Sequence, residues 1–202
     1  MSATNSNLEL PICNHTPTAY DGPSRDEVIA LRHQYVSPGV LTYYQDPLMI
    51  VEGHMQWLFD ETGRRYLDMF AGIVTVSVGH CHPTVLDAVR EQNERLQHTT
   101  TIYLHPNVAR FGKKLAATFP KGSNLSVTYF TNAGSESNDL AILMARAFTG
   151  NWDVIALRNA YHGMSPSTMG LTALHTWKQP VPMGFGVHHA RLPDRFRGQW
   201  GY

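Results

Sequence analysis

The stretch that most constrains the fold is an apolar segment followed by a tight turn, a helical segment and a second apolar segment. Residues 125–131 are rich in aromatic and β-branched residues, which favour a strand. Residues 136–148 are rich in Ala, Leu and Met and predict a helix that Gly150 caps. A second short strand is predicted at 154–157. This order of strand, helix and strand is typical of a parallel sheet covered by helices, and therefore of an α/β fold.

The other elements are predicted from apolar periodicity and from turn residues. Pro83 suits the first position of a helix, and Gly63 provides a turn that can take a positive φ. The predicted elements are a helix at 26–35, a hairpin at 48–68, a helix at 83–97 and a helix at 107–118. Beyond residue 165 the chain is rich in Gly and Pro and predicts no particular element.

Composition excludes several classes of protein. The chain has 202 residues, 43% of them hydrophobic and 16% charged, which is enough apolar material for a packed core in one or two domains. The formal net charge is zero, which argues against a nucleic-acid partner. Two cysteines, Cys13 and Cys81, cannot form a disulfide framework. No segment has the apolar length of a membrane span, and residues 1–25 predict a disordered leader that resembles neither a secretory signal nor a mitochondrial presequence.

The turn between the first predicted strand and its helix is a candidate phosphate site. The first amides of a helix lack intrahelical acceptors and lie at the positive end of its dipole. Gly134 allows a ligand to approach the backbone, and Ser135 adds a hydroxyl donor. The alternative is an ordinary helix N-cap with no ligand.

The loop after the second predicted strand is a candidate for contact with a planar cofactor. In an open parallel sheet, ligands bind outside the carboxyl ends of the strands, where this loop and the Gly134 turn both belong. Tyr161 offers a ring that can stack, and His162 and Gly163 follow it. The alternative is a surface loop whose aromatic ring packs inward.

A metal site is the less favoured interpretation of residues 79–83, which hold His80, Cys81 and His82. Zinc requires three or four ligands at supportive spacing, and His188-His189 is too isolated to complete the set. A turn that leads into the helix at Pro83 is the preferred interpretation, so we expect no metal.

A series of motifs, taken in order and at their spacing, resembles the class III pyridoxal-phosphate aminotransferases. The match runs from about Leu41 to the C-terminus, and a finer match to the mitochondrial branch that acts on alanine and glyoxylate is carried by residues 70–76 and 168–198. The motifs are Tyr66-Leu67-Asp68, Gly72-Ile73, Gly79-His80-Cys81-His82-Pro83, Asn132-Ala133-Gly134-Ser135-Glu136-Ser137-Asn138 and Tyr161-His162-Gly163.

The resemblance implies a fold-type I enzyme that binds pyridoxal 5'-phosphate. Gly134 and Ser135 would hold the cofactor phosphate, Tyr161 would stack on its ring, and His162 would lie beside it. Such enzymes are dimers with active sites at the subunit interface, and the branch implies a mitochondrial location. The chain would hold a leader (1–25), part of the small domain (26–82) and the N-terminal part of the large-domain, mostly parallel sheet (83–202).

The resemblance also implies a reaction between small amino-acid and oxo-acid substrates, here alanine and glyoxylate. A lyase of the same class that acts on phosphorylated amino alcohols is the alternative enzyme. Some relatives that act on ornithine or GABA place an Arg where this chain has Met164, so those substrates are disfavoured. Ser137 stands where the family usually has Ala.

The family's Schiff-base lysine and the acidic partner of the pyridine nitrogen would lie beyond Tyr202. No lysine present occupies that context; the lysines are Lys113, Lys114, Lys121 and Lys178. We therefore expect a fragment or shortened product that is inactive alone. An incomplete sheet would leave Val127, Tyr129 and Val154 poorly covered.

Overall fold

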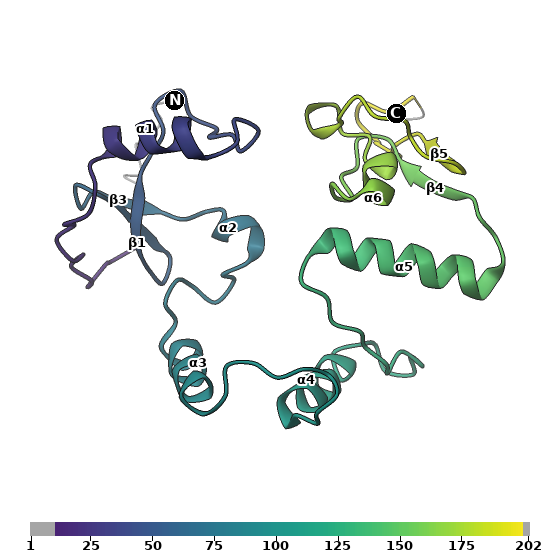
Figure 1. Ribbon diagram of the computed structural model, residues 1–202, viewed down its shortest axis with the longest axis horizontal. Coiled ribbons are helices and arrows are strands. Elements are labelled where there is room, and N and C mark those ends of the chain that lie inside the picture. The colour runs from purple at the N-terminus through teal and green to yellow at the C-terminus, as the bar shows by residue number, and fades with distance from the viewer. Residues whose placement is uncertain (1–10, 200–202) are drawn as a thin grey trace, which may run out of the picture. The chain divides into compact units, whose positions relative to one another are not determined.

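The computed structural model describes residues 11–199, and the chain divides into two compact units that meet in sequence at Tyr103 and Leu104. Each unit is described by itself (Figure 1). Residues 1–10 of the predicted leader lie outside the described residues. Residues 11–24 contain no helix or strand, but Thr18 donates its backbone N–H to the carboxylate of Glu52 at 2.8 Å.

The first unit begins with α1 (Arg25–Tyr35), which confirms the helix predicted there. Ser24 and Glu27 form a reciprocal capping box at its start, so two backbone donors that the helix leaves free are satisfied.

Within residues 11–199, no helix has both the length and the apolar character needed to cross a bilayer.

The predicted hairpin is an antiparallel sheet of β1 (Ile50–His54), β2 (Trp57–Asp60) and β3 (Arg65–Leu67), in that order. The central strand is the buried one: Trp57 and Phe59 are 1% and 2% exposed. Arg65 lies over the Trp57 ring at 4.5 Å, where its stem and charge cover the indole. The core of this unit therefore centres on β2.

Asp60 closes the turn between β2 and β3. Its Oδ1 accepts the N–H and the hydroxyl of Thr62 and the N–H of Arg64, and its Oδ2 accepts the hydroxyl of Tyr66 at 2.7 Å. Burial opposes ionisation of this carboxyl, but the hydrogen bonds outweigh burial and lower the pKa of Asp60. Gly63 completes the turn with a φ of 79°, as predicted.

The rest of the first unit connects this sheet to α3 (Pro83–Arg95), which starts with Pro83 at its first turn as predicted. Before it, α2 (Ala71–Val74) is a single turn with positive φ angles. The backbones of Met55 and His80 exchange two hydrogen bonds of 2.7 Å, which attach the segment before α3 to the sheet.

The second unit begins with α4 (Pro106–Ala116), close to the predicted bounds. Its Phe111 ring stacks on Phe130 at 5.1 Å, and Gly112 lies so close to Thr128 that an added Cβ would be 3.1 Å from the threonine hydroxyl. The small residue therefore lets the extended segment pack on the helix.

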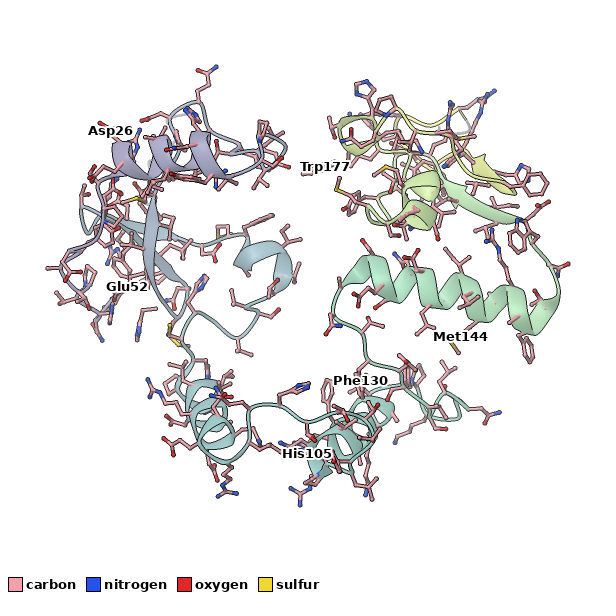
Figure 2. The ribbon with its side chains drawn as sticks, viewed as in Figure 1. Asp26, Glu52, His105, Phe130, Met144 and Trp177 are labelled. Carbon is pink, nitrogen blue, oxygen red and sulfur yellow. The ribbon has the colours of Figure 1, made fainter. Side chains whose placement is uncertain are left out.

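The predicted long helix is α5 (Gly134–Thr149), and Gly150 ends it in the left-handed conformation, with φ 69°. The helix packs against α6 (Pro166–Leu171) in the second unit (Figure 1). On α5, Met144 projects away from α6 and is 56% exposed (Figure 2).

The parallel pairing in this unit joins β4 (Val154–Leu157), the predicted strand, to β5 (Val187–Ala190). The connection between them contains α6 and a 3-10 turn at His175–Trp177, none of which the sequence predicted. The buried side chains of the unit gather here; they are Ala156, Thr168, Met169, Leu171 and Thr172.

The strand predicted at 125–131 is wrong for this structure, because those residues form no strand. Their composition favours an extended backbone, but a strand requires a hydrogen-bonded neighbour, and neither β4 nor β5 pairs with this segment. Val127 and Tyr129 are 94% and 76% exposed, whereas Val154 is half-buried. The parallel sheet is therefore built from β4 and β5 and not from the two strands predicted.

We predict that Asp60→Asn destabilises the first unit by about 1–3 kcal/mol, because a buried acceptor loses part of its hydrogen bonding. Ionised Asp60 stabilises the fold above its unfolded pKa, near 3.8, and this contribution is lost as the pH falls through the lower pKa of the folded state. The difference in unfolding free energy between wild type and variant should therefore shrink in acid, as measured by chemical denaturation across pH.

Asp87→Asn is the matched control, because that carboxylate is 76% exposed and lies 3.7 Å from Arg90. Its effect should stay within about 0.5 kcal/mol. An equal loss for both variants would contradict the role given to Asp60.

Candidate functional site

The start of α5 presents free backbone donors. Ala133 is the N-cap, and no side chain caps the helix. Among the residues that the structure describes, no acceptor lies within hydrogen-bond distance of the N–H groups of Gly134, Ser135 or Glu136. A Cβ built on Gly134 would meet no heavy atom within 4 Å other than those of its chain neighbours and of its own helix backbone, so the space beside Gly134 is open. The arrangement has the donors that an anion needs at a helix N-terminus.

Two side-chain contacts hold this turn in shape. Glu136 reaches back to accept the backbone N–H of Asn132 at 2.8 Å. The hydroxyls of Thr131 and Ser137 are hydrogen-bonded to each other. The turn is therefore fixed from both sides of Gly134 before any ligand is considered.

The structure brings this turn together with the loop at 161–165. The Ser135 hydroxyl accepts the backbone N–H of Met164 at 3.2 Å. Gly163 has a φ of +125°, and a Cβ added to it would lie 2.3 Å from Ser135 Oγ and 2.8 Å from Thr168 Oγ1. Glycine is required at this position for two reasons, the backbone angle and the close approach.

Further contacts in the same place were missed by sequence reasoning. Asn138 donates its side-chain N–H to the carbonyl of His162 at 2.8 Å. The buried Thr172 hydroxyl accepts the N–H of His162 and donates to the carbonyl of Gly163. Asn138 stands in the motif quoted above, but a partner in a distant loop leaves no local sequence pattern.

Tyr161 and His162, the remaining predicted site residues, are in this same loop. The Tyr161 side chain is 49% exposed and meets Trp177 edge-on, with ring centroids 6.0 Å apart. The Nε2 atom of His162 is buried and has no hydrogen-bond partner among the described residues. Among the described residues, the Nδ1 atom of His82 in the first unit is buried and unpartnered in the same way, so this feature by itself does not mark a ligand site.

These features fit a phosphorylated, planar ligand. The free amides and the Ser135 hydroxyl can donate to a phosphate, and the exposed Tyr161 ring can cover an aromatic system. The donor set and the open space before Gly134 therefore match pyridoxal phosphate in kind.

The histidines at 79–83 have structural surroundings. His80 Nε2 pairs with Asp68 at 2.7 Å, and this hydrogen bond is the main cause that lowers the pKa of Asp68. His82 is the N-cap of α3. Within residues 11–199, no group of three or more His, Cys, Asp or Glu side chains could hold a metal ion.

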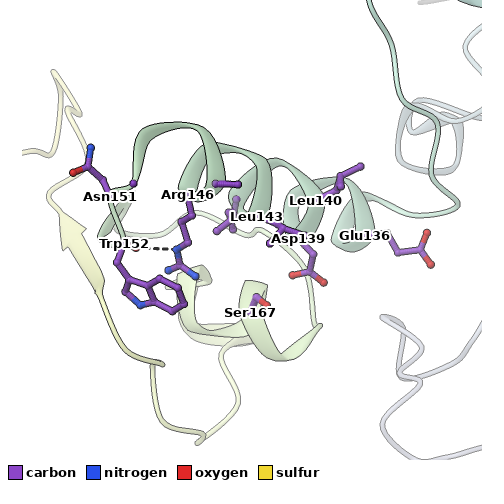
Figure 3. A pocket seen from close by; sticks show the side chains of 11 residues that line it. Glu136, Asp139, Leu140, Leu143, Arg146, Asn151, Trp152 and Ser167 are labelled. Atoms are coloured by element: carbon purple, nitrogen blue, oxygen red, sulfur yellow. Dashed lines mark hydrogen bonds between the residues drawn. The ribbon is translucent and has the colours of Figure 1, made fainter.

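A cavity of about 700 Å³ lies along the face of α5 that carries Asp139, Leu143 and Arg146, and Glu136 from the first turn of the helix also lines it (Figure 3). Arg146 donates to the carbonyl of Trp152 at 2.8 Å and lies over its ring at 4.2 Å. Neither Ser135 nor Tyr161 lines this cavity, so its size does not mark the site described above.

Comparisons with known proteins identify the relatives of this chain. The family model described as aminotransferase class-III matches residues 41–199. Alanine–glyoxylate aminotransferase 2, mitochondrial, of Homo sapiens is 47% identical over 192 residues, which is 95% of this chain and 37% of that protein.

The fold of this chain is also similar to that of solved structures. An (S)-enantioselective omega-transaminase from Thermomicrobium roseum superposes with a TM-score of 0.76 at 30% identity, over 88% of this chain and 42% of its own. A phospholyase from Arthrobacter, solved with phosphoethanolamine, has a TM-score of 0.74 at 32% identity, over 83% and 38%. The chain thus spans less than half the length of each relative. With the family model matching most of its length, the chain belongs to the class III aminotransferases, which are pyridoxal-phosphate proteins of fold type I.

Proposed function

We propose that this chain is part of a transaminase that moves the amino group of alanine to glyoxylate with pyridoxal phosphate. The observation that carries the proposal is the meeting of the Gly134–Ser135 turn with the 161–165 loop, joined by the hydrogen bond between Ser135 and Met164. The 47% identity to a mitochondrial alanine–glyoxylate aminotransferase supports the choice of substrates and a mitochondrial location.

The proposed roles follow from the geometry. The amides of Gly134 and Ser135 and the Ser135 hydroxyl hold the phosphate, because they are free donors in an open space. Tyr161, whose side chain is 49% exposed, covers one face of the cofactor ring, and His162 lies beside that ring. When bound, the cofactor supplies the electron sink that amino-group transfer requires. The residues of this chain bind and orient it.

Met164 bears on the choice of substrate. It is uncharged and 52% exposed, so it offers no positive charge for a substrate carboxylate where some relatives have Arg. We propose that the carboxylate is bound by residues elsewhere in a dimer of the whole protein. We also propose that residues up to His82 belong to the small domain and those from Pro83 to the large domain.

A phospholyase is the second candidate, and the similarity to the Arthrobacter enzyme favours it. The whole protein distinguishes the two: alanine plus glyoxylate should yield pyruvate and glycine, whereas a phosphorylated amino alcohol should release no phosphate. Release of phosphate without pyruvate formation would assign the lyase activity.

A third candidate is a non-catalytic product. We expect the 202-residue chain alone to give no turnover, because its lysines lie outside the family's Schiff-base context.

We predict that Ser135→Ala in the whole protein weakens the binding of pyridoxal phosphate by about 1–3 kcal/mol, because it removes a hydroxyl donor to a charged group. The dissociation constant is measured by titrating the apoprotein and following cofactor absorbance. Thr149→Ala is the matched control, since that hydroxyl lies at the opposite end of the same helix and bonds to the carbonyl of Ala145. Unchanged affinity in Ser135→Ala would remove Ser135 from the site.

We predict that Tyr161→Ala shifts the absorbance of the bound cofactor and lowers transamination, whereas Tyr161→Phe is milder because the ring still stacks. Spectra and initial rates of the two variants test this. Equal damage from both would instead assign the function of Tyr161 to its hydroxyl.

A further inference from the structure

Asp139 is a carboxylate beside the site that the roles above do not use. It lies on α5, one turn after Ser135, and points toward α6 (Figure 3). Its Oδ1 accepts the hydroxyl of Ser165, the N-cap of α6, at 2.8 Å. The α5 helix thus contacts the 162–165 loop three times, through Ser135, Asn138 and Asp139.

The hydroxyl protons around Ser165 are ordered by this carboxylate. A carboxylate accepts hydrogen bonds and donates none, so the single proton of Ser165 Oγ is directed to Asp139. The contact of 2.6 Å between Ser165 and Thr168 must then use the proton of Thr168. In return, Thr168 Oγ1 accepts the N–H of Ser165 at 3.0 Å. Asp139 therefore sets the direction of a short hydrogen-bond chain at the start of α6.

This chain leads back to the ligand donors. The buried Thr168 hydroxyl lies beside Gly163, where a Cβ would come within 2.8 Å of it. Gly163 is followed by Met164, whose N–H is accepted by Ser135 Oγ. A serine hydroxyl has one proton and two lone pairs. Because Ser135 accepts from Met164 on a lone pair, its own proton remains available to donate to another acceptor.

We propose that Asp139 is a positioning residue for the cofactor site: through Ser165 it holds the 162–165 loop against α5, and the Met164 amide in turn orients the Ser135 hydroxyl toward the phosphate. The proposal rests on the proposed cofactor site, but it concerns a residue that touches no ligand. The proposal requires a hydrogen-bond acceptor at position 139 but no negative charge there. This requirement distinguishes it from a general electrostatic effect of the carboxylate.

The experiment compares Asp139→Ala, Asp139→Asn and wild type in the whole protein. The affinity for pyridoxal phosphate should fall roughly three- to tenfold in Asp139→Ala, the range expected when the orienting effect of one ordinary hydrogen bond is lost. It should stay close to wild type in Asp139→Asn, whose amide oxygen still accepts from Ser165. Asp153→Ala is the control, because that carboxylate is in the same unit and 68% exposed, and it should leave the affinity unchanged.

A second readout does not depend on the cofactor. In the apoprotein, amide hydrogen exchange in a peptide covering residues 160–168 should be faster in Asp139→Ala and restored in Asp139→Asn. A double-mutant cycle with Ser165→Ala should show that Asp139→Ala adds little once the Ser165 hydroxyl is absent. A wild-type protein that binds no pyridoxal phosphate would refute the proposed function. The hydrogen-exchange data would still test the contact between Asp139 and the 162–165 loop.

Three outcomes would overturn the proposal. The first is unchanged affinity and exchange in Asp139→Ala. The second is an Asp139→Asn variant as damaged as Asp139→Ala, which would assign the effect to charge. The third is full additivity of the Asp139 and Ser165 changes, which would show that they act independently.

Discussion

At Gly163 the loop after β4 comes so close to the first turn of α5 that no side chain fits between them. The approach allows the amide of Met164 to reach Ser135, and it places His162 within reach of both Asn138 and Thr172. Without this contact, the free amides of α5 and the Tyr161 ring would belong to separate surfaces. The proposed binding site depends on this boundary between two segments, at which backbone atoms of the loop lie against the first turn of α5.

The two units of the chain rely on buried polar groups in similar ways. In the first, Asp60 gathers four hydrogen bonds within a tight turn, and Asp68 pairs with His80. In the second, Thr168 and Thr172 are fully buried and bond to backbone and hydroxyl groups around them. Buried polar side chains thus supplement a small apolar core in each unit. Their hydrogen bonds to neighbouring groups offset the free-energy cost of burying them.

Local chemistry made the longer helices α1, α3, α4 and α5 predictable. Pro83 and Gly150 mark helix ends by their backbone preferences, and the apolar run at 154–157 is a strand as its composition indicates. The segment 125–131 has equally good strand composition, but strand formation depends on a partner that composition does not encode. β5 was missed for the opposite reason, because its Val-His-His-Ala sequence has no strong apolar pattern and its pairing with β4 defines it.

The residues of the candidate site also differ in how far their role can be predicted from local sequence. Gly134, Ser135, Tyr161 and His162 stand in short motifs with a chemical reason of their own, so sequence reasoning selected them. Asn138 and Asp139 differ, since their importance lies in the loop that they contact and is visible only when the chain has folded.

The site's contacts also have consequences for folding order. The hydrogen bonds from α5 to the loop span 29, 24 and 26 residues, and all lie within the second unit. The entropic cost of closing loops of this length grows only slowly with the number of residues. These contacts need no residue of the first unit, so they can form once the second unit has been synthesised, and a ligand that binds only the folded unit would stabilise it.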